Sequence, residues 1–209
     1  MIHPLLSKLK STYPTTRFKS AKKKGRFVMH NDIKYILADE KKIQETCDKL
    51  AAQINADYPD NERELVFVIV LKGSVLFASD LIRRINRPCT MEFMKVSSYG
   101  SGVETSGFIQ VSLDLKRDIK DVDVVIIEDI IDSGRTLQKL CSLLATRGAH
   151  SVKTCALLDK PDRRQVEMEV DYSGLIIPDE FVVGYGLDFA EYYRNLPYIG
   201  VLDPSVYSE

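Results

Sequence analysis

Two uninterrupted apolar runs, LVFVIVL at 65–71 and VVII at 124–127, constrain the fold more than any other feature of the chain. A strand with one face in water alternates apolar and polar side chains, whereas a strand buried on both faces does not. The two runs therefore predict inner strands of a parallel sheet that is covered by helices on both sides.

The segments around these runs alternate between helical and strand-like patterns. Apolar residues recur at helical spacing in three segments, 39–58, 74–84 and 133–147. Strand patterns occur at 91–98, 108–115, 151–160, 172–177 and 181–185. The alternation predicts an α/β fold, with a central parallel sheet flanked by helices and right-handed crossovers.

The length of 209 residues suits a single domain. We expect its core to span about residues 36–165. We expect the last 45 or so residues to pack as an extra lobe, so that a small hood is formed by about residues 1–35 and 166–209.

The composition argues against several classes of protein. The net charge of −1 gives no reason to expect nucleic-acid binding, and we interpret the basic segment 17–26 as a solvated surface arm. No apolar stretch approaches the ~20 residues of a membrane span, and the start MIHPLLSKLK lacks the apolar core of a signal peptide. The four cysteines form no CxxC pair, which predicts reduced thiols in a cytoplasmic protein.

Polar residues follow the predicted strands at four places. They are Lys72-Gly73, Ser98-Tyr99, the stretch 128–136, and Asp159-Lys160. Ligands of parallel α/β sheets bind beyond the carboxyl ends of the strands, so we expect these residues to converge on one cleft.

The turn DSGRT at 132–136 has the features of a phosphate site. It leads into a helix whose first N–H groups have no acceptor within the helix, and Gly134 lets a ligand approach the backbone closely. A simple helix cap formed by Asp132 or Ser133 explains the same residues equally well. Glu128 and Asp129 add carboxylates that can accept hydrogen bonds from sugar hydroxyls or hold Mg²⁺. Together the turn and the acids predict a site for a ribose 5-phosphate.

The stretch VVIIEDIIDSGRTL at 124–137 resembles the phosphoribosyl-pyrophosphate signature of type I phosphoribosyltransferases. Four further segments resemble parts of the hypoxanthine-guanine phosphoribosyltransferases: LKGS at 71–74, SSYG at 97–100, ALLDK at 156–160 and FVVGYGLDFAEYYRNLPYIGVL at 181–202. The resemblance implies the type I phosphoribosyltransferase fold. It also implies an Mg²⁺-dependent purine salvage enzyme, which transfers ribose 5-phosphate from phosphoribosyl pyrophosphate to hypoxanthine or guanine and so forms IMP or GMP. Whether xanthine is also used stays open.

The resemblance also implies roles for individual residues. Asp132 would be the general base at purine N7. The 5-phosphate would bind to Ser133, Gly134, Arg135 and Thr136. Glu128 and Asp129 would hold the ribose hydroxyls and Mg²⁺, and Asp188 in the purine-binding part would bind a second Mg²⁺.

The remaining roles concern the purine, the pyrophosphate and a lid. Lys160 would donate to the 6-oxo group, Phe181 would stack on the base, and the backbone of Val182 would read its edge. Lys72, Gly73 and Arg194 would hold pyrophosphate, next to a peptide bond that can be cis in this family. Ser98 and Tyr99 would belong to a mobile lid.

Two positions depart from the pattern of many relatives. Arg135 replaces a frequent lysine, and Gly186 replaces a bulkier residue in the purine pocket. Two other hypotheses stay open: an adenine or pyrimidine phosphoribosyltransferase, which Lys160 and Phe181 argue against, and an RNA-binding regulator on the same scaffold, which only the segment 17–26 supports. The expected assembly is a homodimer or a homotetramer.

Overall fold

The computed structural model of the protein describes residues 31–59, 62–98 and 109–208. The strands are β1 (Ile33–Ala38), β2 (Leu65–Val70), β3 (Thr90–Ser98), β4 (Ile109–Leu113), β5 (Asp123–Ile131), β6 (Ser151–Asp159), β7 (Tyr172–Ile176), β8 (Val182–Val183) and β9 (Ile199–Leu202). The helices are α1 (Glu40–Asp57), α2 (Val75–Ile82) and α3 (Arg135–Thr146), with short 3-10 turns at η1 (Pro161–Arg163) and η2 (Pro204–Val206). The basic segment 17–26 and Tyr99 lie outside the described residues.

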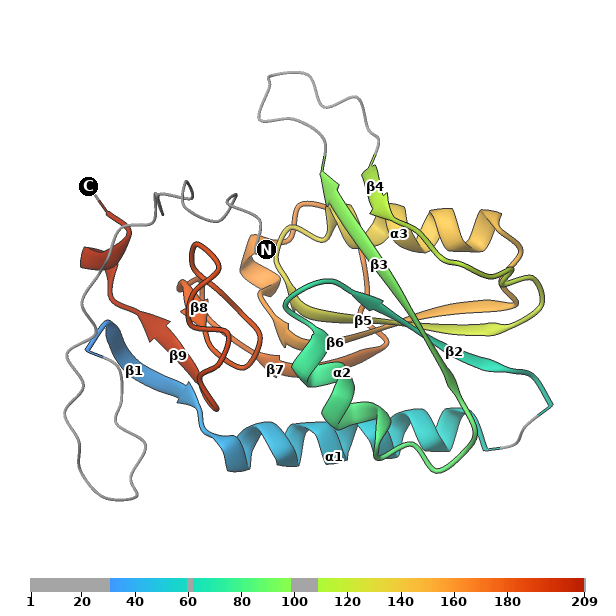
Figure 1. Cartoon of the computed structure of the whole chain (residues 1–209), viewed down its shortest axis with the longest axis horizontal. Coiled ribbons are helices and arrows are strands. Elements are labelled where there is room, and N and C mark those ends of the chain that lie inside the picture. Colours follow the sequence, from blue (N-terminus) through green and yellow to red (C-terminus); the bar gives the residue numbers. More distant parts are fainter. Residues whose placement is uncertain (1–30, 60–61, 99–108, 209) are drawn as a thin grey trace, which may run out of the picture. The chain divides into compact units, whose positions relative to one another are not determined.

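A six-stranded sheet in the order β4-β3-β2-β5-β6-β7 forms the core (Figure 1). Five of its strands are parallel, and the edge strand β4 runs antiparallel to β3. The predicted α/β class with a central parallel sheet is therefore confirmed. None of the described helices is both long and apolar enough to cross a membrane.

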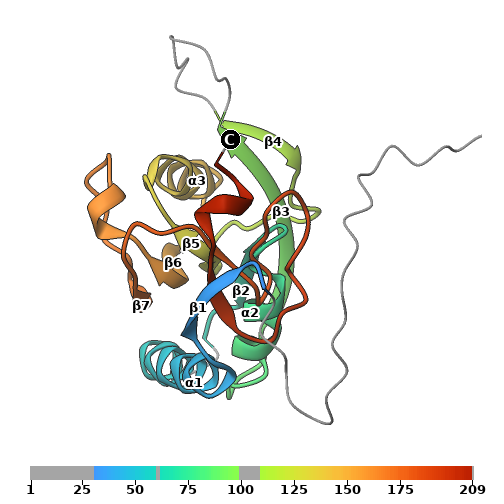
Figure 2. The same cartoon turned by 90° about the vertical axis from the view of Figure 1, so that its left-hand side faces the viewer.

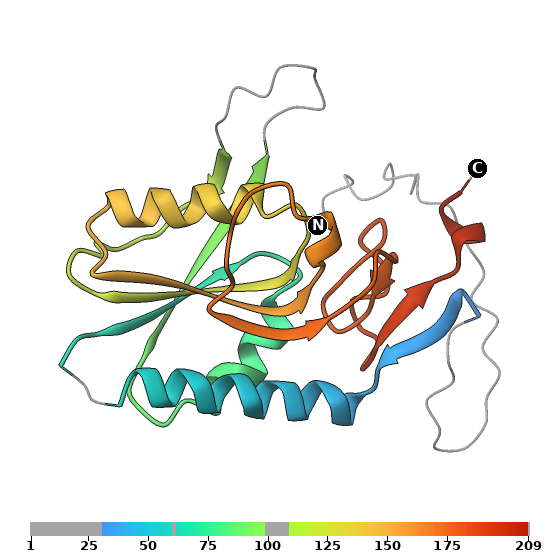
Figure 3. The same ribbon diagram turned by 180° about the vertical axis from the view of Figure 1, so that it is seen from behind.

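The inner strand β2 explains why its sequence does not alternate. Its residues are all buried, and alternate side chains enter two different clusters: Leu65 and Phe67 pack on one face of the sheet, and Val66 and Val68 on the other. Helices α1 and α2 cover the first face and α3 covers the second (Figure 2). From behind, α1 is seen to lie along β6 and β7 (Figure 3).

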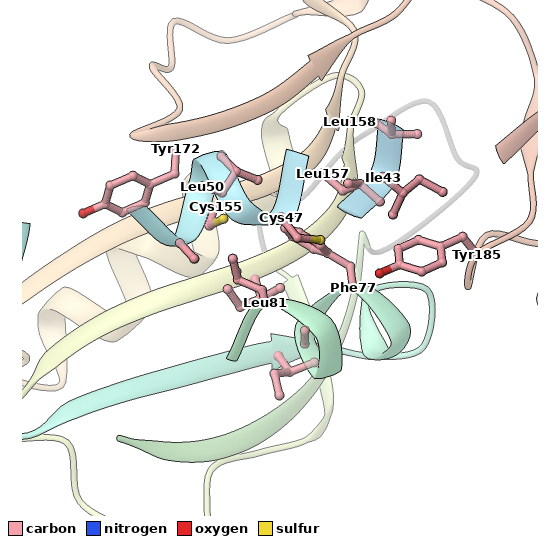
Figure 4. Close-up of a cluster of buried hydrophobic side chains, with 14 of the residues drawn as sticks. Ile43, Cys47, Leu50, Phe77, Leu81, Cys155, Leu157, Leu158, Tyr172 and Tyr185 are labelled. Atoms are coloured by element: carbon pink, nitrogen blue, oxygen red, sulfur yellow. The ribbon is translucent and has the colours of Figure 1, made fainter. Parts of the chain in front are cut away.

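The cluster beneath α1 and α2 contains two of the four cysteines (Figure 4). Cys47 and Cys155 are fully buried free thiols, packed near Phe77 and Leu81. Burial raises the pKa of Cys47 to about 11 and that of Cys155 well above its ordinary value, so both stay protonated at neutral pH. They act as apolar core residues, and each large side chain buried here contributes about 1.5–3 kcal/mol.

A separate three-stranded antiparallel sheet has the order β1-β9-β8. Its outer strand β1 pairs along β9, with Ile33 opposite Leu202 and Ala38 opposite Ile199. Strand β7 does not join this sheet but pairs with β6 in the six-stranded sheet, where its residues bury apolar side chains against α1. The predicted division into a core at about 36–165 and a hood stays a prediction.

Strand β5 is longer than the apolar run that predicted it. Its pairing with β2 ends at Ile69 opposite Ile127, but its pairing with β6 continues to Ile131 opposite Asp159. The sequence had suggested that Glu128 and Asp129 follow the strand. In the structure they lie within it. Since β2 turns away at this point, one side of the last part of β5 is left open to form a pocket.

Candidate active site

A pocket of about 430 Å³ lies at the carboxyl ends of β2 and β5. Its lining comes from four parts of the chain: the end of β2 and the loop after it, Val96 and Ser97 near the end of β3, the end of β5 with the turn into α3, and the loop after β8. The predicted residues among its lining are Lys72, Gly73, Glu128, Asp129, Asp132, Ser133, Gly134, Thr136, Asp188 and Arg194. Segments separated by more than 100 residues in the sequence thus meet in one place, as expected for a sheet of this class.

Glu128 and Asp129 place two carboxylates next to each other in this pocket. Burial raises the pKa of Glu128 well above its ordinary value, and the nearby charge of Asp129 raises it further. Burial also raises the pKa of Asp129 to about 6, although its hydrogen bonds with the backbone lower it. Two ionised carboxylates are therefore costly here unless a cation or hydroxyl donors accompany them.

The donor chemistry of this pair fits Mg²⁺. No group of three or more His, Cys, Asp or Glu side chains in the described part of the chain is arranged to hold a metal by itself. Mg²⁺ usually takes only one or two carboxylates from a protein and completes its shell with water and substrate phosphates. Glu128, Asp129 and Asp188 have the oxygen ligands that such an arrangement requires.

The turn before α3 offers backbone donors. Gly134 has a φ of 77°, a left-handed conformation that suits glycine, and the helix begins at Arg135. The first N–H groups of the helix have no carbonyl partner within it, and Ser133 and Thr136 line the same pocket. Arg135 is exposed and is not among the residues that line the pocket, so the predicted role of its side chain stays a prediction.

Asp132 is paired with an arginine that the sequence analysis did not single out. The Nε atom of Arg163 lies 3.0 Å from Oδ1 of Asp132, and Nη1 of Arg164 donates to the backbone oxygen of Asp132 at 2.8 Å. Both arginines follow β6: Arg163 is the last residue of the turn η1, and Arg164 comes directly after it. The only sequence signal for them is a basic pair shortly after Lys160 at the end of a strand.

The loop after β2 is held by close backbone contacts. The peptide bond between Leu71 and Lys72 is cis, which the family resemblance had allowed. A Cβ atom on Gly73 would lie 1.4 Å from Oδ2 of Asp129, so only glycine fits. A Cβ atom on Gly186 would lie 2.0 Å from the backbone oxygen of Gly73. The departure at Gly186 therefore has a structural reason, since the loop after β8 approaches the loop after β2 at this residue.

Charged side chains connect these two loops. Arg194 lies 2.7 Å from Asp188 and 3.5 Å from Glu191, and it donates to the backbone oxygen of Gly186 at 2.7 Å. Lys72 lies 2.7 Å from the other carboxylate oxygen of Glu191. The hydrogen bond from Lys72 lowers the pKa of Glu191, and the charges of Lys72 and Arg194 lower it further, so Glu191 is ionised at neutral pH.

Of the residues predicted to bind the purine, Asp188 lines this pocket, whereas Lys160, Phe181 and Val182 are not in its lining. Lys160 is only 8% exposed, and its Nζ donates to the backbone oxygen of Glu180 at 2.7 Å. Val182 is buried in β8. The ring of Phe181 lies 5.2 Å from that of Tyr207, tilted by 34°, so part of its surface is already in aromatic contact.

The predicted lid falls largely outside the described residues. Ser98 is the last residue of β3, whereas Tyr99 and the rest of the loop to residue 108 are not described. Their predicted role stays a prediction.

Sequence reasoning overlooked three residues that the structure brings to the predicted site. Arg163 contacts Asp132, Glu191 contacts both Lys72 and Arg194, and Tyr207 packs on Phe181. Each was near a recognised segment but carried no pattern of its own.

Comparisons with known proteins agree with this geometry. Residues 36–190 match the phosphoribosyl transferase domain family. The hypoxanthine-guanine phosphoribosyltransferase of Staphylococcus aureus strain Mu50 is 51% identical over 180 residues, which cover 86% of this chain and 99% of the relative. The bifunctional protein TilS/HprT of Listeria monocytogenes serotype 4b is 50% identical over 185 residues, 88% of this chain and 28% of that protein.

A solved structure extends the comparison to three dimensions. A hypoxanthine phosphoribosyltransferase from Staphylococcus aureus superposes with a TM-score of 0.82 at 51% identity, covering 88% of this chain and 98% of that one. The family match spans well over half of the chain, and the relative from Staphylococcus aureus aligns along nearly its whole length. The chain therefore belongs to the phosphoribosyl transferase family, among its hypoxanthine-guanine phosphoribosyltransferases.

Proposed function

We propose that the protein transfers ribose 5-phosphate from phosphoribosyl pyrophosphate to a ring nitrogen of hypoxanthine or guanine and releases pyrophosphate. The observation that carries this proposal is the convergence of two carboxylates, the turn at the start of α3 and two cations in one pocket. A phosphorylated sugar diphosphate has the complementary groups: a terminal phosphate, hydroxyls and a diphosphate.

The turn Ser133 to Thr136 would bind the 5-phosphate through backbone N–H groups and hydroxyls. Glu128 and Asp129 would accept hydrogen bonds from the ribose hydroxyls, and Lys72 and Arg194 would face the diphosphate. Bond breaking at the anomeric carbon leaves positive charge on the sugar, as in glycosidic cleavage. The two carboxylates would stabilise that charge.

Glu128, Asp129 and Asp188 would hold the magnesium ions. Bound magnesium would supply charge neutralisation for the leaving pyrophosphate. The protein's own share is to orient the substrate and to exclude water around it.

Asp132 would accept a hydrogen bond from purine N7 and so take the proton as the base attacks. The Nζ of Lys160 donates to Glu180 and lies 3.7 Å from Oδ1 of Asp179, and a lysine has three donors, so it would also donate to the 6-oxo group of the purine. An amino group at this position is itself a donor, so adenine would be disfavoured. Phe181 would stack on the base, with Val182 beside it.

The cellular setting and the assembly follow as further parts of the proposal. The described cysteines are all free thiols, which supports a cytoplasmic enzyme. Val75, Leu76, Met91 and Phe93 expose apolar side chains from α2 and β3, which supports a homodimer or homotetramer. The single-domain organisation, with a hood built around the sheet β1-β9-β8, belongs to the same proposal.

The test is nucleotide formation from phosphoribosyl pyrophosphate and Mg²⁺, with hypoxanthine, guanine, xanthine and adenine offered separately. We expect turnover of hypoxanthine and guanine and none of adenine. Turnover of adenine alone, or of no base, would overturn the proposal. Activity with xanthine would extend the substrate range without changing the mechanism.

A further inference from the structure

The carboxylate of Glu191 occupies the space between the two cations of the pocket. Its Oε2 lies 2.7 Å from Nζ of Lys72, and its Oε1 lies 3.5 Å from Nη2 of Arg194. Each oxygen thus faces a different cation, one from the loop after β2 and one from the loop after β8. A diphosphate bound to both cations would place its anionic oxygens in the same way.

The backbone around Glu191 is built to hold this position. Ala190 and Glu191 have φ values of 49° and 71°, in the left-handed region that residues other than glycine seldom adopt. The N–H of Glu191 donates to Oδ2 of Asp188 at 2.8 Å, and Phe189 pairs with Tyr192 across the turn. The tight turn therefore directs this one side chain at Lys72 and Arg194.

The side chain of Glu191 is held only weakly by the two cations. Glu191 is 65% exposed and Lys72 is 52% exposed, so their ion pair is screened by water and weak. Asp188, in contrast, is only 29% exposed where it contacts Arg194 at 2.7 Å. The two acids of this loop differ accordingly, since Asp188 fixes Arg194 and Glu191 can be displaced from it.

We propose that Glu191 is a displaceable internal counter-ion of the pyrophosphate site, which competes with pyrophosphate for Lys72 and Arg194. The inference rests on the proposed function only in taking pyrophosphate as the anion that the two cations bind. When the anion is absent, Glu191 neutralises the cations. When pyrophosphate is formed, Glu191 returns and helps to release it, and such release steps limit turnover in many enzymes. Glu191 is a positioning residue, because it acts through Lys72 and Arg194.

The experiment compares the full-length protein with Glu191→Gln, which keeps the size of the side chain and removes its charge. Glu45→Gln is the matched control, because Glu45 forms an exposed ion pair with Lys41 on α1, with an N–O distance of 3.7 Å. The first measurement is the dissociation constant of pyrophosphate with Mg²⁺ by titration calorimetry, which needs no turnover. The second is KM for phosphoribosyl pyrophosphate, KM for hypoxanthine and kcat.

In Glu191→Gln we expect pyrophosphate to bind about 2- to 10-fold tighter, the range that one or two exposed ion pairs allow. KM for phosphoribosyl pyrophosphate falls by a similar factor, KM for hypoxanthine stays unchanged, and Glu45→Gln behaves like the unmodified protein. Unchanged or weaker pyrophosphate binding in the variant overturns the inference, because Glu191 is then a bystander or a support for Lys72. Should the glutamine variant not fold, Glu191→Asn serves instead, since asparagine tolerates left-handed φ and is too short to span both cations.

The two proposals fail in different ways. If the unmodified protein forms IMP but the variant binds pyrophosphate no tighter, this inference is wrong and the proposed function stands. If no base is turned over but the variant binds pyrophosphate tighter, the proposed function is wrong and the role of Glu191 as a counter-ion stands.

Discussion

The guanidinium of Arg163 lies 3.0 Å from the carboxylate of Asp132, the residue proposed as the general base. Arg163 also lies 3.4 Å from Asp179, so it bridges two acids from different loops. About half of the Arg163 side chain is exposed, which makes it easy to displace. A purine that binds Asp132 through N7 would take over the hydrogen bond that Arg163 makes in the absence of ligand.

Replacement of Asp132 by asparagine removes the proton acceptor and keeps the shape of the side chain. We expect kcat to fall by about 100-fold or more, the usual contribution of a general base. KM for phosphoribosyl pyrophosphate should change little, since the phosphate turn is intact. Steady-state kinetics check this, with Asp162→Asn on the exposed turn η1 as the control. A kcat within threefold of the unmodified protein would exclude Asp132 as the base.

Lys160→Met tests the specificity for 6-oxo purines. Loss of one hydrogen bond from a charged donor should lower kcat/KM for hypoxanthine and guanine by about 10- to 100-fold. KM for phosphoribosyl pyrophosphate is the internal control and should stay the same. If KM for phosphoribosyl pyrophosphate rises by the same factor by which kcat/KM for the purines falls, Lys160 supports the fold through its bond to Glu180 and does not contact the base.

Gly73→Ala tests the contact between the loop after β2 and Asp129. The added Cβ would collide with the carboxylate at 1.4 Å, so either the loop or Asp129 must move. We expect kcat/KM for phosphoribosyl pyrophosphate to fall by about 100-fold, because a displacement of about 1 Å at a reacting site has this effect. Gly148→Ala is the control: its φ of 85° makes the substitution cost about 1 kcal/mol of stability, but it lies away from the pocket. Similar kinetics for both variants would refute the expectation.

Tyr207 should support the base-stacking face of Phe181. The two ring centroids are 5.2 Å apart, and Phe189 meets Phe181 edge-on at 5.7 Å. Tyr207→Ala should raise KM for hypoxanthine by about 2- to 10-fold, since an aromatic pair is worth about 0.5–1.5 kcal/mol. Tyr207→Phe keeps the ring and should behave like the unmodified protein. Equal effects of the two substitutions would show that the hydroxyl matters and not the ring.

The ion pair between Asp114 and Arg147 gives a prediction for stability against pH. Arg147 donates to both carboxylate oxygens of Asp114, at 2.6 and 2.8 Å, and this lowers the pKa of Asp114 from its ordinary value of 3.8. A lowered pKa in the folded state stabilises the protein above the ordinary value, and the gain is lost as the pH falls through the folded pKa. Asp114→Asn should therefore lower the free energy of unfolding by at most about 1 kcal/mol at pH 7, because the pair is partly exposed.

Urea unfolding at pH 7 and at successively lower pH measures this difference. It should shrink below the ordinary pKa of the carboxyl group and disappear once Asp114 is protonated in both states. A difference that persists at the lowest pH would assign the effect to packing and not to charge.

Features that depend on neighbouring residues, such as the buried strand β2 and the acidic turn after β5, could be predicted from the sequence. The run at 65–71 predicted a strand buried on both faces. In the structure all six residues of β2 are buried. Glu128, Asp129 and the turn Ser133–Thr136 were predicted together because they are neighbours in the sequence. That they share a pocket with Lys72 and Arg194 followed only from the topology of the sheet.

Features that depend on pairing between distant segments could not be predicted from the sequence. Strand β1 is recognised only through β9, since Ile33 lies opposite Leu202 at the other end of the chain. The true length of β5 depends on β6, which pairs with it beyond the last residue that pairs with β2. The turn at Glu191 could not be predicted, because neither Ala190 nor Glu191 is a residue type that commonly adopts left-handed backbone.

The close approach of Gly186 to the backbone oxygen of Gly73 has a consequence for how the site can vary. Gly73 belongs to the loop proposed to hold pyrophosphate, and Gly186 to the loop that carries Asp188 and Arg194. Where two main chains touch without side chains between them, their spacing cannot be adjusted by changing a rotamer. The spacing between the proposed pyrophosphate loop and the loop that carries Asp188 is thus a property of the backbone. Substitutions elsewhere in the site can then alter which base binds, while the spacing of these two loops stays constant.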